Sequence, residues 1–509
     1  MDRQTKLIVF FFCLIKLSLH LIADYHSGFQ GDELIHIETG NHLAFGYMEF
    51  PPLISIVAFI QNVFNSDSVF VHHLFPHLCS ILIMFYVAKI VLFLGGKEKA
   101  LILALLAIII APGFERSQQL FQPVVFSQLF WTINFYYFLV YSKTLENKNL
   151  WLLTIFSIIG FLFKYDSLFF IFGLSGLLFF KKTRNALIQQ KFWKNILVFL
   201  LAISPNIIWQ FQNNFPFFQM MHRLKETQLE KLNSAEIITD LFISINPLNS
   251  IFILLPAILF FILTKEKFLK IIGVGVLLSF MALLINKGKA YYFYPIILTL
   301  IPFGAVFWQI FVFNKKRWIF YPLTIILLFG AILIPFGMPV YSLNKYIQRV
   351  YPYEKLEIEG GSYGIKFDEY YSDQKWEKTL SAIKTVYDSL PSNEKTEALI
   401  WAKHYSQAGI LKLKKEKYNL PNAFSYHGSF YIWSPNQGEI PKTIIAFRES
   451  KEDGKSFFEP YFESVIPVKT IYNPYAKKED ELYQTIFICK QPKQDFKQLK
   501  QQFSKRIFE

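Results

Sequence analysis

Long apolar runs, separated by short charged or polar segments, follow one another through the first 340 residues of this chain. Eleven of them approach the length that a helix needs to cross about 30 Å of hydrocarbon, and because several are short we expect that number to hold within about two. They lie near residues 7–23, 69–94, 100–113, 124–142, 150–163, 168–180, 196–209, 248–264, 270–286, 291–313 and 318–340. The pattern predicts a mainly α-helical, polytopic transmembrane bundle.

The composition agrees with a membrane protein, since 53% of the 509 residues are hydrophobic and the mean hydropathy is +0.31. A net charge of +14 could indicate a nucleic-acid partner, but the Lys and Arg residues cluster between apolar runs, which favours the bilayer explanation. The first run resembles a signal peptide. Because it carries Lys16 and His20 late and lacks a small-residue cleavage site, we predict a retained helix.

Loop charges predict the orientation of the bundle. If the N-terminus is cytoplasmic, the cytoplasmic loops carry an excess of Lys and Arg, as the positive-inside rule requires. The outward segments are then 24–68, 111–123, 164–167, 210–247, 287–290 and everything after about 340. We therefore expect a multi-pass protein of the cytoplasmic (inner) membrane, with loop 24–68 and the C-terminal residues extracytoplasmic.

The chain divides into two predicted domains, a transmembrane domain over 1–340 with the outer loop 24–68, and a soluble domain over 341–509. The second is polar and contains a turn signal at Glu359-Gly360-Gly361. Helical spacing of apolar residues predicts a helix over 376–390, and two short apolar runs predict buried strands at 443–447 and 485–488. These elements predict a small α/β domain outside the membrane.

The outer loop holds a polar stretch between Phe29 and Pro52. It contains four acids and two histidines, namely Asp32, Glu33, Glu38, Glu49, His36 and His42. Asp32 and Glu33 follow Gly31, where a helix could begin with acids in its first turn, and this cap with solvated charges is one interpretation. The other is a carboxylate that acts as a general base at the membrane surface. Neighbouring helical side chains point about 100° apart, so the two acids should have different roles.

Glu49 precedes the rigid segment Phe50-Pro51-Pro52, where the chain returns toward the bilayer. A lone Glu before a turn is usually only exposed. Because Glu49 shares its loop with Asp32, we also consider it a second catalytic residue or a metal ligand.

Lysines and tyrosines mark other outward positions. Candidate substrate or phosphate contacts are Lys164, Tyr165, Lys287, Lys289, Tyr291 and Tyr292, with Asn206, Trp209 and Gln210 nearby in the pattern. Such residues also anchor helices at the membrane interface, which is the alternative interpretation. Acids on one loop and lysines on others indicate a base opposite an anion site, for which a lipid-linked phosphate is the natural ligand. We interpret His72, His73 and His77 as interfacial polar residues.

The Asp32-Glu33 pair and the run from Gly46 to Pro52 resemble motifs of GT-C glycosyltransferases of the protein O-mannosyltransferase type, which include bacterial aminoarabinose transferases acting on lipid A. The likeness is to bacterial glycosyltransferase family 39 in particular, and it covers nearly the whole chain. Further similar segments follow in order: Phe130-Trp131, Lys164-Tyr165, 205–210, 215–217, 288–292, 405–409, 425–433 and 473–476.

The resemblance implies a hexosyl or pentosyl transferase that passes a sugar from a polyprenyl-phosphate carrier to a lipid, glycan or protein acceptor on the outer face, with inversion. Carried over by motif, Asp32 is the general base with Glu33 beside it. Glu49 is an acceptor-side or metal-binding acid, and Lys289 and Tyr292 contact phosphate.

This chain departs from the family pattern at two positions. Many relatives have His where it has Phe50, and an acid where it has Ser127. These departures leave a divalent metal cofactor and the details of phosphate binding open.

Two other functions remain as alternatives. One is a lipid-linked sugar binder or flippase without transfer chemistry, in which the same acids and lysines only recognise a headgroup. The other is a structural membrane protein whose outer domain binds an envelope partner.

Overall fold

The computed structural model describes residues 1–230, 232–354, 365, 369–476 and 481–508, so the turn expected at 359–361 lies outside the described residues. The chain forms two compact units. The transmembrane unit consists of Met1–Ala23, Phe45–Ile54 and His73–Val340. The α/β unit consists of Asp24–Ala44, Ser55–His72 and Tyr341–Glu509, so that parts of the outer loop 24–68 belong to the same unit as the C-terminal residues.

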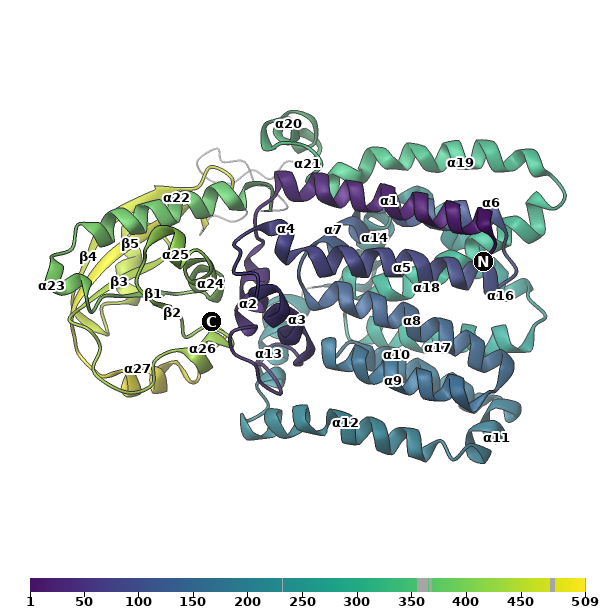
Figure 1. Cartoon of the computed structure of the whole chain (residues 1–509), viewed down its shortest axis with the longest axis horizontal. Coiled ribbons are helices and arrows are strands. Elements are labelled where there is room, and N and C mark those ends of the chain that lie inside the picture. The colour runs from purple at the N-terminus through teal and green to yellow at the C-terminus, as the bar shows by residue number, and fades with distance from the viewer. Residues whose placement is uncertain (231, 355–364, 366–368, 477–480, 509) are drawn as a thin grey trace. The chain divides into compact units, whose positions relative to one another are not determined.

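The transmembrane unit is a helical bundle (Figure 1). Among the described residues, seven helical segments are long and apolar enough to cross a bilayer, or nine if each of two bent pairs is one span. The seven are α1 (Arg3–His26), α5 (Leu74–Phe93), α8 (Pro123–Thr144), α12 (Trp193–Gln212), α17 (Lys267–Ile285), the segment Ala290–Phe313 around α18 (Tyr294–Phe307), and Arg317–Phe336 around α19 (Phe320–Phe329). The remaining two expected runs are the shorter α9 (Asn147–Phe163) and Ser167–Phe179, which begins with α10 (Ser167–Gly173). The mainly α-helical fold class is confirmed.

Two of the predicted apolar runs are bent. α6 (Glu98–Ile109) and α7 (Pro112–Gln119) meet at 68°, and α14 (Ser234–Ser244) meets Pro247–Leu263, the segment with α15 (Pro247–Asn249) and α16 (Leu255–Leu263), at 100°. A proline opens the second part of each pair, where it has no N–H to continue the first helix.

The Asn246 side chain joins the two breaks. Its amide donates to the carbonyls of Ile110 (2.8 Å) and Gly330 (3.0 Å). Its oxygen accepts from the backbone N–H of Leu248 at 3.0 Å. This one side chain therefore hydrogen-bonds backbone groups at both breaks.

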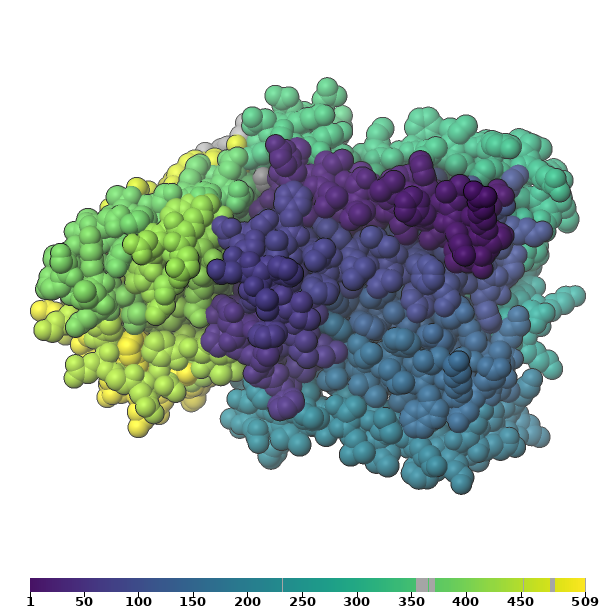
Figure 2. All heavy atoms as spheres, in the orientation of Figure 1, coloured from purple at the N-terminus to yellow at the C-terminus, as the bar shows by residue number. Residues whose placement is uncertain are grey.

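Helix α1 has one apolar and one charged face. Leu7, Phe10 and Phe11 are exposed, and Figure 2 shows this helix in purple along the surface of its unit, as expected for contact with lipid. On the buried face Lys16 Nζ lies 2.7 Å from Glu115 Oε1 on α7, and both side chains have no exposed area. An ion pair in an apolar bundle neutralises two charges that hydrocarbon would not tolerate singly.

The α/β unit contains a five-stranded sheet in the order β2-β1-β3-β5-β4. Its strands are β1 (Leu399–Ala402), β2 (Ala423–Phe424), β3 (Thr443–Glu449), β4 (Phe462–Tyr472) and β5 (Tyr483–Pro492). β1 pairs in parallel with β2 and β3, whereas β5 is antiparallel to β3 and β4. The predicted strands at 443–447 and 485–488 lie within β3 and β5, and α22 (Glu369–Asp388) covers most of the predicted helix.

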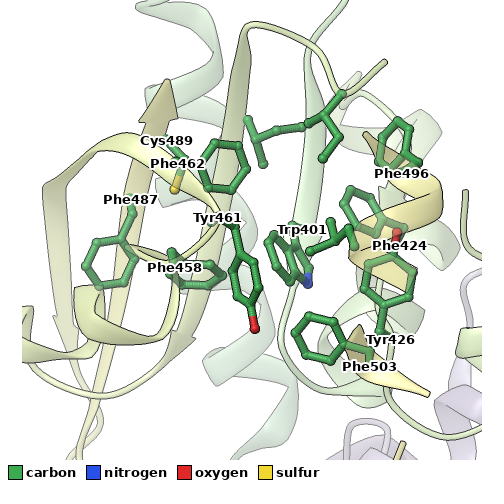
Figure 3. Packing of buried hydrophobic residues seen from close by; sticks show 14 residues of the cluster. Trp401, Phe424, Tyr426, Phe458, Tyr461, Phe462, Phe487, Cys489, Phe496 and Phe503 are labelled. Carbon is green, nitrogen blue, oxygen red and sulfur yellow. The ribbon is translucent and has the colours of Figure 1, made fainter. Parts of the chain in front are cut away.

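Aromatic side chains form the core beside this sheet. Trp401 of β1 is 1% exposed and lies among the rings of Phe424, Tyr461 and Phe503, the last from α27 (Phe496–Phe503) (Figure 3). Large aromatic side chains bury about 150–250 Å² each, so this cluster is the main apolar contribution to the unit.

Candidate active site

Helix α2 (Gly31–Thr39) presents the two predicted acids differently. The Gln30 side chain accepts a hydrogen bond from the Asp32 N–H at 2.8 Å, and Glu33 Oε2 accepts one from the Gln30 N–H at 2.8 Å. This reciprocal cap buries Glu33 completely and leaves Asp32 exposed. The expectation of a helix beginning at Gly31 with acids in its first turn is confirmed, and the cap accounts for the orientation of both side chains.

Asp32 is hydrogen-bonded within the α/β unit. The Tyr405 hydroxyl, at the start of α24 (Tyr405–Leu413), donates to Asp32 Oδ1 at 2.5 Å. The Tyr405 ring stacks on His427 with centroids 4.9 Å apart and lies 4.1 Å from the His404 ring. One oxygen of an exposed carboxylate is thus bound by a phenol whose ring packs against two imidazole rings, which also contact each other at 4.3 Å.

The two histidines beside Tyr405 are neutral. Burial, with a smaller effect from the charges of Lys403 and Lys375, lowers the pKa of His404 to about 3. The pKa of His427 is also well below its ordinary value because of burial. His404 Nδ1 accepts from the Ser406 N–H at 3.2 Å, which places the imidazole proton on Nε2. Neither ring therefore adds a positive charge next to Asp32 at neutral pH.

Helices α2 and α24 pack closely because a glycine lies at their contact. A Cβ added to Gly409 would come within 2.8 Å of Leu34 Cβ and 3.1 Å of the Leu34 carbonyl oxygen. Near the N-terminal ends of both helices, Gly31 faces Ser406. The close approach brings Tyr405 to Asp32 and, two turns further along, Lys412 to Glu38.

Glu38 is the centre of a second polar cluster on α2. Its side chain is 7% exposed, and its oxygens accept hydrogen bonds from Lys412 (2.5 Å), His42 (3.0 Å) and Asn41 (2.9 Å). Burial alone would raise the pKa of this carboxyl, but the hydrogen bonds from His42 and Lys412 and the charge of Lys412 lower it overall. His42 in turn stacks on Trp433 with centroids 4.5 Å apart. Sequence reasoning gave Glu38 no role, although its spacing of four residues from His42 was a usable signal.

In the transmembrane unit, polar side chains hold the segment that contains Glu49. Asn206 donates to the carbonyl of Phe45 at 2.9 Å, and Gln210 donates to that of Tyr47 at 3.0 Å. The Tyr165 hydroxyl donates to Asn206 Oδ1 at 3.0 Å. Glu49 itself is partly buried. The structure therefore brings together residues that the sequence placed in three separate outward segments.

Gly46 and Phe50 explain how tightly this segment is held. Gly46 lies so close to Trp209 that an added Cβ would be 2.6 Å from its ring. Phe50, where many relatives have His, is buried and lies 5.3 Å from the Tyr47 ring. The departure at position 50 thus replaces a titratable ring with an apolar contact.

Lys164 lies beside two of the other predicted phosphate-binding residues. Its ammonium group is 4.2 Å from the Tyr292 ring centroid and 5.6 Å from that of Tyr291. It also forms an ion pair with Asp166, whose Oδ1 accepts a hydrogen bond from Ser127 at 2.7 Å. A carboxylate therefore lies next to position 127, where this chain has Ser.

Lys287 and Lys289 have different neighbours. Lys287 donates to the carbonyl of Glu230 at 3.2 Å, and Lys289 donates to the Gln228 side chain at 2.5 Å. Their hydrogen bonds thus involve residues of the segment 210–247, which the loop charges predict to face outward.

Two buried histidines of the transmembrane unit, His73 and His77, have ring nitrogens within 4.8 Å of each other. Imidazoles are common zinc ligands. Residues of this pair could contribute to a metal site, and a metal in this chain stays a prediction.

Comparison with known proteins supports the fold and the family resemblance. Residues 50–209 match the family model described as dolichyl-phosphate-mannose-protein mannosyltransferase. ArnT from Cupriavidus metallidurans, solved with undecaprenyl phosphate and in the apo state, is 12% identical with a TM-score of 0.60, and the match covers 94% of this chain and 97% of that one. The oligosaccharyltransferase AglB from Archaeoglobus fulgidus, in complex with an inhibitory peptide and a dolichol-phosphate, is 13% identical with a TM-score of 0.47 over 87% of this chain and 69% of that one. No curated protein sequence matches this chain.

Proposed function

We propose that this chain, a membrane protein with the fold and family resemblance of a GT-C glycosyltransferase, transfers a sugar from a polyprenyl-phosphate donor to a hydroxyl group of an acceptor. The observation that carries the proposal is the exposure and hydrogen bonding of Asp32. It is an exposed carboxylate on a capped helix, hydrogen-bonded through one oxygen by Tyr405. A base needs a fixed position and access to its substrate, and this arrangement supplies both.

In the proposed reaction Asp32 accepts the proton of the acceptor hydroxyl as that oxygen attacks the anomeric carbon. The bond between the anomeric carbon and the phosphate oxygen breaks, and its electron pair leaves with the polyprenyl phosphate. Attack from the face opposite the leaving group inverts the configuration. Tyr405 holds Oδ1, so that Oδ2 can take the proton. General base catalysis of this kind contributes about 10²–10⁴-fold to a rate.

Lys164 is the proposed cationic contact for the phosphate, whose charge grows as the bond breaks. Its ion pair with Asp166 and the flanking Tyr291 and Tyr292 rings fix its position. Tyr165 orients the neighbouring Asn206. Lys287 and Lys289 are proposed to contribute further positive charge toward the same anion.

The other two acids have supporting roles in this proposal. Glu33 positions Asp32 by completing the cap of α2. Glu49 is proposed to contact the acceptor, and it is the carboxylate that would coordinate a divalent metal ion. No step of the reaction depends on that ion.

We place the reaction on the outer face of the cytoplasmic membrane. Support comes from the excess of Lys and Arg in alternate loops of the transmembrane unit, which favours a cytoplasmic N-terminus. The donor then reaches the site from the lipid phase, and the acceptor is a lipid, a glycan or a protein.

The test incubates the purified full-length protein with a panel of polyprenyl-phosphate sugars and identifies glycosylated products by mass spectrometry. Asp32→Asn should lower transfer by at least about 100-fold. Asp388→Asn is the matched control, because Asp388 is half-exposed and, among the residues that the structure describes, pairs only with Lys384 on its own helix α22. Near wild-type transfer by a folded Asp32→Asn protein would contradict the assignment. Movement of the carrier across a bilayer without a new glycosidic bond would support the flippase alternative.

A further inference from the structure

A polar cleft of about 330 Å³ lies within the α/β unit. Its walls come from α2, from residues 62–67 and from α24 together with α25 (Lys415–Tyr418). This volume is at the lower end of the range of about 300–1,000 Å³ that small-molecule sites occupy. Carboxylates, amides and lysines dominate its lining, which is unlike an apolar ligand pocket.

Hydrogen bonds of Asn41, which follows α2, and of Asn62 fix the wall of the cleft beside α2. Asn41 donates to Glu38 Oε2 at 2.9 Å, and Asn62 donates to Asn41 Oδ1 and to the Ile37 carbonyl, both at 3.0 Å. Both amide groups are thereby oriented. A preorganised polar wall of this kind recognises a ligand without an ordering cost.

The charges of the cleft argue against an anionic ligand. Both lysines in the lining are already paired, Lys412 with Glu38 at 2.5 Å and Lys417 with Glu377 at 3.1 Å. Asp67 and Glu416 also line the cleft, and within the described part of the chain neither has an ion-pair partner. A phosphate or carboxylate would be repelled by these two acids and would have to compete with Glu38 and Glu377 for the lysines.

The same lining also disfavours a simple cation site, because the ammonium groups of Lys412 and Lys417 lie in it. What the cleft offers is a set of acceptors and donors at fixed positions: carboxylate oxygens, amide groups and ammonium groups. Sugar hydroxyls, which both donate and accept, satisfy such a mixed set.

We propose that this cleft binds a neutral, hydroxyl-rich saccharide portion of the acceptor. The proposal rests on the proposed glycosyltransferase function, because it assigns the ligand to the acceptor side. We assign the ligand to the acceptor because α2 carries both the proposed base and a residue of the cleft. Asp32 lies at the start of α2 and Glu38 six residues later, a distance of about 9 Å along the helix axis. A saccharide in the cleft would therefore extend along the helix that carries the proposed base.

The test measures binding of neutral di- and trisaccharides of glucose, galactose, mannose and N-acetylglucosamine to the full-length protein. The protein is kept in a detergent without a sugar headgroup, and saturation-transfer NMR reports contact. Asp67→Asn combined with Glu416→Gln should weaken binding at least about tenfold. The control is Glu459→Gln, an exposed acid of the same unit outside the cleft, which should bind as the wild type does.

Outcomes separate this proposal from the proposed function. If the wild type transfers sugar, the double variant should raise the KM for the acceptor and leave kcat within about twofold, while Asp32→Asn should lose transfer and keep saccharide binding. Failure of all neutral saccharides to bind, or equal binding by the double variant, would overturn the proposal even if transfer depends on Asp32. Binding of MgCl₂ or CaCl₂ that the double variant abolishes, without saccharide binding, would identify a cation site instead and would also overturn it.

Discussion

Gly409→Ala tests whether the close contact between α2 and α24 positions Asp32. The added Cβ would lie 2.8 Å from Leu34 Cβ and 3.1 Å from the Leu34 carbonyl oxygen. Carbon atoms pack best about 3.5–4.0 Å apart, so the helices must separate locally by about 1 Å. The Leu34 atoms are a Cβ and backbone, which no side-chain rotation can move aside.

The expected effect on stability is small because two contributions oppose each other. Alanine favours a helix over glycine by about 1 kcal/mol, whereas overpacking costs about 1–3 kcal/mol. The net loss in free energy of unfolding is therefore about 0–2 kcal/mol. The effect on geometry is larger, since a 1 Å shift would lengthen the 2.5 Å contact between Tyr405 and Asp32 beyond an ordinary hydrogen bond. Misplacement of a catalytic group by about 1 Å can lower a rate by about 10²-fold.

The assay combines sugar transfer with hydrogen exchange on the full-length protein. We expect Gly409→Ala to lower transfer by about 10–100-fold, to speed exchange in α2 and α24, and to leave the strands of the sheet protected. Gly31→Ala is the matched control, since its Cβ would approach Ser406 Cβ only to 3.3 Å and needs a shift of a few tenths of an ångström. Wild-type transfer and exchange in Gly409→Ala would refute the reasoning that this contact positions Asp32.

Three further predictions concern stability. Lys16→Met should lower the free energy of unfolding by about 3–5 kcal/mol, because it leaves the Glu115 carboxylate buried without its cation. The double variant with Glu115→Gln should recover most of that stability, and a thermal melt measures both changes. His36 and His404 have pKa values near 3, below the ordinary 6.5, because both are buried, so the unfolded chain binds more protons and stability falls as the pH drops below about 6.5. Each of these histidines should lower the free energy of unfolding by about 1.4 kcal/mol in total between pH 7.5 and 5.5, measurable by hydrogen exchange of the α/β unit, and a flat profile would contradict the assigned neutral rings. Trp401→Ala should destabilise the α/β unit by about 3–5 kcal/mol, whereas exchange in the transmembrane helices should not change.

The features that the sequence predicts correctly are those with a local cause. The start of α2 at Gly31, the strands around 443–447 and 485–488, and the apolar helices all follow from the spacing of neighbouring residues. The two bends are not among these features, because the mean hydropathy of a run does not register the proline at which a helix breaks. The sequence contains Pro112 and Pro247, but only the structure shows that the chain turns by 68° at the first break and by 100° at the second.

The contacts that define the candidate site have no local cause. Tyr405 lies 373 positions from Asp32, and Lys412 lies 374 positions from Glu38. No periodicity spans that separation, which is why sequence reasoning placed Asp32 on an outer loop and found no partner for it.

The same pair of contacts indicates why the α/β unit includes part of the outer loop. A short helix such as α2, with only nine residues, is marginal in isolation and needs tertiary packing to form. α24 supplies that packing through Gly409 and the ion pair of Lys412 with Glu38. The C-terminal residues therefore do more than add a separate domain, because they complete the helix on which the proposed base is carried. A variant that loosens α24 should affect catalysis before it affects the transmembrane bundle.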